Sequence, residues 1–364
     1  MKIPAEALLL FALAACGATG GLESYGDRER APSALAPERR GPVVAARVEL
    51  DRGDASAARA LLEQAVAAAP GDVGMHVMLQ EAELAAGENA EALRERYRTL
   101  ARERDDATAW ILAARLETDG TVAAEDLERA LARDARSAWA HYGQAYLMAR
   151  EGLWTEARER LDRTLELDPA HLPARRLEAA LFARDGRLEE AAEAFEAWLE
   201  ASAEDPRVDP VLRLATELDL AMVELESGRP RAARERLARL GEAVGPATSA
   251  GRRLCLLAAT EQALGHSELA LEAARRAEDA NPESPLPKVQ QALLYEQWLG
   301  DPAAAREAWQ RVLGRARTST DLTDLIQSMR ARVVLERLEA SSAARAPSPA
   351  REPGSAGNPT PPGP

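Results

Sequence analysis

Histidine and cysteine are the rare side chains of this sequence that could perform acid–base, metal or nucleophilic chemistry; Asp and Glu pairs occur throughout, and nothing in their spacing selects a catalytic pair. The chain has four histidines, His76, His141, His171 and His266. No two of them lie four residues apart beside a glutamate, which is the spacing of a helix-borne zinc site. Cys255 lies in the apolar run Leu254–Leu257, where a thiol packs as a small hydrophobic side chain. Because no phosphate-binding loop, dinucleotide fingerprint or G-x-S-x-G elbow occurs either, we expect no catalytic, metal-binding or cofactor-binding residue.

The other cysteine, Cys16, follows a short apolar segment at the start of the chain. Residues 1–15 begin with Met-Lys and end in nine apolar residues, too few to cross a bilayer as a helix. The motif Leu13-Ala14-Ala15-Cys16 resembles the bacterial lipoprotein box. The resemblance implies that residues 1–15 are a signal peptide and that Cys16 is lipidated, anchoring the protein in the cell envelope. Gly17, in place of the Asp of an inner-membrane retention signal, favours the outer membrane, with the protein facing the periplasm or the cell surface.

Two terminal segments have compositions that oppose folding. Residues 16–40 are rich in Gly, Pro, Ser and charged residues, and residues 346–364 are rich in Pro and Gly. Such segments bury too little apolar surface to offset the entropy lost on ordering. We therefore predict a disordered tether over 16–40 and a disordered tail over 346–364.

Between these ends, glycines recur every 32 to 42 residues. They are Gly53, Gly87, Gly120, Gly152, Gly186, Gly228, Gly265 and Gly300. An alanine usually follows five residues later, at Ala58, Ala92, Ala157, Ala191, Ala233, Ala270 and Ala305. The segment Gly152–Leu161 aligns with Gly186–Phe195 without a gap. A period of this length indicates repeated helical hairpins, in which glycine supplies the turn and the small residue allows close helix approach.

This pattern resembles the tetratricopeptide repeat over residues 41–317, as about eight repeats. The resemblance implies an all-α solenoid of helical hairpins whose first helices line a concave groove that binds proteins or peptides. Three repeats depart from the pattern. The second lacks a closing proline, the third has a short turn at Asp119–Thr121, and the sixth is long.

Helical periodicity supports the same fold. Within 188–200, the apolar residues Leu188, Ala191, Ala192, Phe195, Trp198 and Leu199 share one helix face and five glutamates share the other. Residues 318–345 predict one more helix, with an apolar stripe at Leu322, Leu325, Ile326, Met329 and Val333. This resembles the helix that caps such arrays, and the alternative is a docking helix for a partner.

Two features could bind a partner. The first is a set of aromatic residues on the first helices of the third and fourth repeats, Trp110, Trp139, Tyr142 and Tyr146. Tyrosine and tryptophan are common interface anchors, although these positions also suit core packing. The second is charge, because residues 187–226 hold twelve acidic residues and three arginines. These acids are either a solvated helix face or a groove segment that attracts a basic partner.

We expect a lipid-anchored scaffold that binds a protein or peptide partner, for example in the assembly of an envelope complex. With a net charge of −14 and a pI of about 5.0, the chain has the wrong sign to bind a nucleic-acid backbone. Two alternatives are a periplasmic helical-repeat enzyme, which would need acids and bases converging in the groove, and a cytoplasmic scaffold whose N-terminus is mis-assigned.

Overall fold

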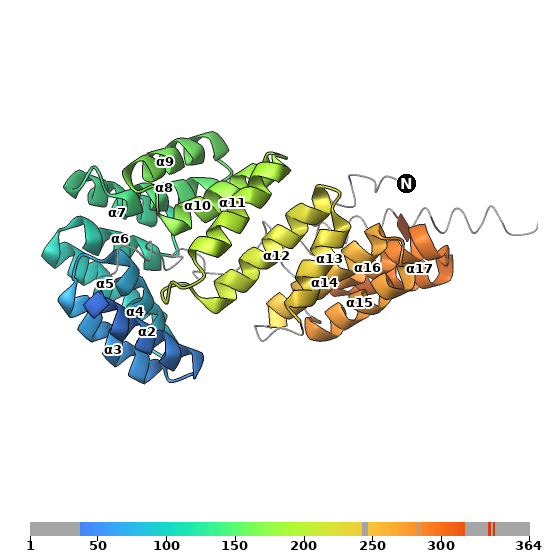
Figure 1. The fold of residues 1–364 in the computed structure, drawn as a ribbon, viewed down its shortest axis with the longest axis horizontal. Coiled ribbons are helices and arrows are strands. Elements are labelled where there is room, and N and C mark those ends of the chain that lie inside the picture. Colours follow the sequence, from blue (N-terminus) through green and yellow to red (C-terminus); the bar gives the residue numbers. More distant parts are fainter. Residues whose placement is uncertain are drawn as a thin grey trace, which may run out of the picture. The chain divides into compact units, whose positions relative to one another are not determined.

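The computed structural model describes residues 37–241, 247–282, 284, 286–316, 334, 335 and 338. In this part of the chain all regular structure is helical, as predicted, and it contains no strand (Figure 1). None of these helices is long and apolar enough to cross a membrane. The predicted signal peptide, Cys16, the predicted tether as far as residue 36 and the predicted tail all lie outside the described residues.

The chain divides into two compact units at His266. The helices of the N-terminal unit are α2 (Pro37–Asp51), α3 (Ala55–Ala68), α4 (Val73–Ala85), α5 (Ala90–Arg104), α6 (Ala107–Leu116), α7 (Gly120–Arg133), α8 (Ala138–Arg150), α9 (Trp154–Leu167), α10 (Leu172–Arg184), α11 (Leu188–Ala201), α12 (Pro210–Glu226), α13 (Pro230–Arg239) and α14 (Ala247–Ala263). Successive pairs from α2–α3 to α12–α13 form the first six predicted repeats. The array is a helical-hairpin solenoid.

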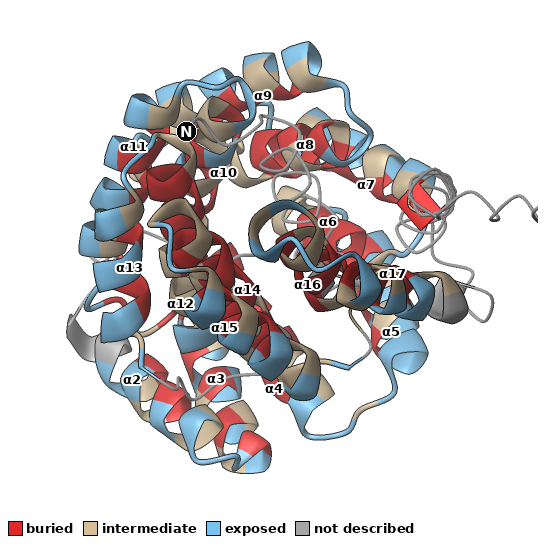
Figure 2. Ribbon diagram, turned by 90° about the vertical axis from the view of Figure 1, so that its right-hand side faces the viewer, coloured by how far each residue is buried: buried red, intermediate tan, exposed pale blue. Residues whose placement is uncertain are grey.

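The two helices of a repeat differ in burial. In the N-terminal unit, α6, α8, α10 and α12 lie on the inside of the curve, and α7, α9, α11 and α13 lie on the outside (Figure 2). The inner helix α4 buries every residue from Val73 to Gln80, whereas the outer helix α11 buries only Ala191, Ala192, Phe195 and Trp198. We call the even-numbered helices α4–α14 the inner helices and the odd-numbered helices α3–α13 the outer helices.

Small residues occupy the crossing points between paired helices. Ala58, Ala157, Ala191 and Ala233 are completely buried, as the repeat pattern predicts. Ala92 is an exception, because it is exposed and Leu93 takes the buried position. The reason is the start of α5: Asn89 caps this helix, so it begins three residues after its glycine, while α9 begins two residues after Gly152. The buried position therefore shifts by one residue.

Glycine forms the turn at seven of the eight predicted breaks, where it adopts a positive φ that other residues rarely adopt. Gly120 differs from the prediction, because it is the first residue of α7 and has no positive φ. Here the chain leaves α6 in an extended conformation at Glu117. Arg94 Nε from α5 donates to the carbonyl of Leu116 at 3.2 Å. This bond satisfies a carbonyl at the end of α6, where a glycine turn would supply backbone amide donors instead.

The C-terminal unit contains α15 (Ser267–Ala280), α16 (Leu286–Leu294), the π-helical turn η2 (Tyr295–Leu299) and α17 (Pro302–Ala316). Its core centres on Trp309, which is fully buried and donates through Nε1 to Glu296 at 3.2 Å. Val334 and Leu335 are buried in the same cluster. The predicted apolar stripe from Leu322 to Val333 lies outside the described residues, so its capping role stays a prediction.

Candidate functional site on the inner helices

The four predicted groove aromatics do not share one environment. Trp110 on α6 is only 8% exposed. Its Nε1 donates to Asp105 Oδ1 at 2.9 Å, and the Arg129 guanidinium from α7 lies 5.1 Å from its ring. The Arg129 contact packs Trp110 against the outer helix of its own repeat, and the Asp105 contact ties it to the end of α5. The core-packing interpretation therefore describes Trp110 better than groove contact.

Trp139, Tyr142 and Tyr146 form one aromatic cluster on α8 together with His171. The ring of His171 lies 4.5 Å from that of Trp139 and 5.2 Å from that of Tyr142. Tyr142 is buried, with 3% exposure, and its ring lies 6.3 Å from that of Tyr146. Trp139 and Tyr146 are only partly buried. The inner helix α8 thus offers two partly exposed aromatic side chains supported by two buried rings.

A buried polar network joins α4 and α6 on one side of this cluster. Arg115 Nη1 donates to Gln80 Oε1 at 2.9 Å, and its Nη2 donates to Glu81 Oε1 at 2.7 Å. Gln80 Nε2 in turn donates to the carbonyl of Leu112 at 3.0 Å. These side chains link neighbouring repeats rather than the two helices of one repeat. They fix how one inner helix lies against the next.

A second polar chain crosses three inner helices on the other side. Arg176 of α10 donates to Thr216 Oγ1 at 2.9 Å and to Asp219 Oδ2 at 3.0 Å, both on α12. Arg252 of α14 donates to Asp219 Oδ1 at 2.5 Å. Two guanidinium groups therefore share one carboxylate, and all three side chains keep partial contact with solvent.

The acidic segment 187–226 lies mainly away from the inner surface. Its five glutamates on the outer helix α11, Glu189, Glu190, Glu193, Glu196 and Glu200, are all exposed. On α12, Glu217 and Glu224 pair with Arg236 of α13 at 2.5 Å and 2.9 Å, in addition to the Asp219 pairs above. This arrangement favours the solvated-face interpretation of the acids over an acidic groove.

Two of the histidines have the same structural role, which the sequence did not reveal. His76 Nε2 lies 3.0 Å from the carbonyl of Pro70, and His141 Nε2 lies 3.2 Å from that of Ala135, six residues back in each case. Burial lowers the pKa of both rings, which favours the neutral form. In other repeats a cation makes the same contact, as Arg175 does with Pro169. The shared position in the repeat was the available signal.

His171 and His266 also have local partners. His171 caps the start of α10 by accepting a hydrogen bond from the backbone of Ala174 at Nδ1, 3.3 Å away. His266 Nδ1 lies 2.8 Å from Glu261 Oε2.

Burial raises the pKa of the Cys255 thiol to about 12, which suppresses the reactive thiolate. In the described segments no three His, Cys, Asp or Glu side chains gather as metal ligands would.

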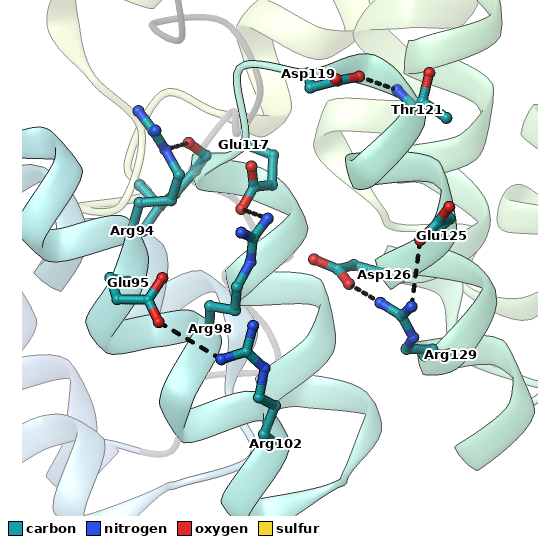
Figure 3. Close-up of polar contacts among 11 residues, drawn as sticks. Arg94, Glu95, Arg98, Arg102, Glu117, Asp119, Thr121, Glu125, Asp126 and Arg129 are labelled. Atoms are coloured by element: carbon teal, nitrogen blue, oxygen red, sulfur yellow. Dashed lines mark hydrogen bonds and ion pairs between the residues drawn. The ribbon is translucent and has the colours of Figure 1, made fainter.

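Carboxylates with raised pKa values occur between α5 and α7 (Figure 3). Burial raises the pKa of Glu117 and of Asp126. Glu117 pairs with Arg98, and Asp126 pairs with Arg129 at 2.5 Å. Arg98 of α5 holds Glu117 at the short α6–α7 turn, and Arg129 holds Asp126 within α7, so each acid has a structural partner.

The C-terminal unit has a polar cavity of about 740 Å³ between α15, α16, η2 and α17. Arg275 Nη2 donates to the hydroxyl of Tyr295 at 2.6 Å, and Arg311 Nη2 donates to Gln291 Oε1 at 3.0 Å. Gln291 Nε2 donates to Glu278 at 2.8 Å. These wall groups bind one another, so the cavity defines no ligand class.

Comparisons with known proteins agree with this geometry. A family model described as tetratricopeptide repeat matches residues 43–108, 118–169 and 149–206. The chain is similar to a solved structure of the APC/C hetero-tetramer Cut9–Hcn1, at 13% identity and a TM-score of 0.59, over 78% of this chain and 55% of that chain. It thus spans about half the length of that protein.

Two further solved structures are less similar to this chain. Yeast Tom70 is 13% identical with a TM-score of 0.48, over 92% of this chain and 70% of that chain. PilW, a type IV pilus biogenesis factor, is 19% identical with a TM-score of 0.46, over 57% and 91%. A search of curated proteins gave no match. The family match, the helical hairpins and the buried alanines together show tetratricopeptide repeats over residues 43–108 and 118–206.

Proposed function

We propose that the protein is a non-enzymatic scaffold that binds a protein or peptide partner on the inner helices of its N-terminal unit. The observation that carries this proposal is the pair of partly exposed aromatic residues on α8, Trp139 and Tyr146. Buried rings and polar networks on both sides hold this surface in place. A preorganised aromatic surface loses little conformational entropy on binding, which is why such residues often dominate interface energies.

The arginines beside this surface suggest one property of the partner. Arg176 and Arg252 share Asp219 and keep partial contact with solvent, so their guanidinium groups are accessible to a carboxylate of the partner. We expect the partner to contribute an acidic group here and an aromatic or aliphatic side chain at α8. The attraction should weaken as salt concentration rises.

The test of this site is capture of partners from the organism's own envelope fraction with the full chain and two matched variants. Trp139→Ala should reduce recovery of the specific partner at least tenfold, because it removes an interface anchor. Trp154→Ala removes the same side chain from the outer helix α9 and should leave recovery unchanged. Equal recovery with both variants, each with a wild-type circular dichroism spectrum, would contradict the inner-helix site.

We further propose that Cys16 is lipidated and that residues 16–40 tether the scaffold to the envelope, with the outer membrane favoured. What supports this is the sequence Leu13-Ala14-Ala15-Cys16 behind a short apolar segment. Multiple acyl chains anchor a protein stably, whereas one chain does not. Cys16→Ser should move the folded protein from the membrane fraction to the soluble fraction. A variant that still sediments with membranes after a salt wash would exclude acylation as the anchor.

A further inference from the structure

The connection between α11 and α12 is longer than the other connections from α2 to α13. It comprises residues 202–209, which we call the strap, and together with the longer helix α12 it accounts for the length of the sixth repeat. The strap has a fixed internal structure. Asp205 and Arg207 form an ion pair of 2.6 Å, and both side chains are completely buried. Val208 packs against Leu172 and Trp198.

The strap contacts the first repeat. Arg47 of α2 donates from Nε to the carbonyl of Pro206 at 3.0 Å and from Nη2 to the carbonyl of Arg207 at 3.4 Å. The partners are separated by 159 and 160 residues in the sequence. Repeat arrays are held mainly by contacts between neighbouring repeats, so this contact joins two parts of the array that nearest-neighbour packing leaves apart.

The chemistry of the contact makes it specific. Arg47 is only 8% exposed, and burial lowers its pKa while Asp209, Asp51 and Asp205 oppose that effect. A guanidinium in such a place needs acceptors, and the strap presents two adjacent carbonyls in a conformation that the Asp205–Arg207 pair holds. Asp205 also accepts a hydrogen bond from the backbone amide of Arg207 at 3.0 Å. This hydrogen bond and the ion pair hold the segment that carries both acceptor carbonyls.

We propose that the strap and Arg47 form a latch that closes the N-terminal unit on itself. With the latch made, α2 is held against the strap and the array of inner helices has one fixed curvature. With the latch released, α2 and α3 keep only their contacts with the following repeat, and the curvature can change. The latch is a property of the N-terminal unit alone, and it stands whether or not the inner helices bind a partner.

The experiment is hydrogen exchange of the full chain, read in peptides that cover the strap and α2. Backbone amides of Asp205, Arg207 and Val208 are hydrogen-bonded within the strap, so their exchange reports its opening. Arg47→Ala removes a charge-assisted donor, and we expect exchange of the strap to become roughly ten- to a hundredfold faster. Arg47→Gln keeps most of the side-chain stem and provides the same comparison if the alanine variant folds poorly.

Arg52→Ala is the matched control, since Arg52 is on the turn that follows α2, is 67% exposed and pairs with Glu49. This variant should leave exchange of the strap unchanged. Small-angle scattering should also show a larger radius of gyration for Arg47→Ala than for Arg52→Ala. Unchanged strap exchange in the Arg47 variants would overturn the latch. Faster exchange confined to α2 and α3 would overturn it too, because Arg47 would then stabilise only its own repeat.

Discussion

The inner and outer helices of the N-terminal unit differ in how much of their surface is exposed to solvent. From Val73 to Gln80 the inner helix α4 has no exposed residue, so each polar side chain there contacts another part of the protein. The outer helix α11 exposes five glutamates and buries one apolar face. A polar group in the buried part of an inner helix thus needs a partner within the protein, whereas a polar group on an outer helix can be satisfied by solvent.

We expect the largest loss of stability when a charge is placed in the packing between an inner and an outer helix. Ala191 of α11 is completely buried. Ala191→Glu should lower the free energy of unfolding by about 3–5 kcal/mol, because the carboxylate would be buried without a hydrogen-bond or ion-pair partner. Urea unfolding followed by circular dichroism measures this change. Glu190→Ala, on the exposed face of the same helix, should leave the midpoint unchanged, and equal midpoints would show that the helix faces are assigned wrongly.

The next largest effect concerns a polar contact between inner helices. Arg115→Ala should lower the free energy of unfolding by about 2–4 kcal/mol, since it leaves the buried Gln80 and the partly buried Glu81 without their shared donor. Arg133→Ala removes an exposed pair with Asp105 on an outer helix and serves as the control. We expect that control to unfold like the wild type. If both variants lose the same stability, inner polar contacts are no more important than outer ones.

A smaller effect should follow from the inner histidines. The folded pKa values of His76 and His141 lie below the unfolded value of about 6.5, so the unfolded state takes up protons first as the pH falls. Their contribution to stability is present above that pH and is lost below it. A His76→Gln/His141→Gln double variant should show a weaker fall in unfolding midpoint between neutral and mildly acidic pH. Parallel pH profiles for the two proteins would contradict this.

The smallest effect is expected at a turn that joins an inner to an outer helix. Gly120 begins α7 without a positive φ, and an added Cβ would lie 3.6 Å from Glu151 Oε1, an ordinary contact. Gly120→Ala should therefore be neutral or stabilise by up to about 1 kcal/mol. Gly186 has a φ of +75°, and Gly186→Ala should lower the thermal midpoint. A lower midpoint for the Gly120 variant would show that its turn needs glycine after all.

Much of the fold could be predicted because it depends on local periodicity. The spacing of glycine and alanine located the hairpins, and the apolar face within 188–200 is the face that α11 buries. Gly120 and Ala92 could not be assigned correctly from spacing alone. At Gly120 an arginine from α5 replaces the glycine turn, and at Ala92 the cap at Asn89 shifts the helix start.

The candidate site was less predictable for a different physical reason. Trp110 and Trp139 both occur on first helices, and their sequence neighbourhoods do not show that one is buried and the other partly exposed. The environment of each depends on side chains that arrive from other helices, such as Arg129 over Trp110 and His171 beside Trp139. Arg47 is the extreme case, because its acceptors lie 159 and 160 residues away and produce no periodic signal.

The strap also has a consequence for the order in which the protein folds. Each hairpin closes a short loop, but the contact of Arg47 with the strap can form only after most of the N-terminal unit is assembled. We therefore expect it to be absent from the folding transition state. Replacing Arg47 should leave the folding rate nearly unchanged and raise the unfolding rate. The latch would then lengthen the lifetime of the assembled array without slowing its assembly.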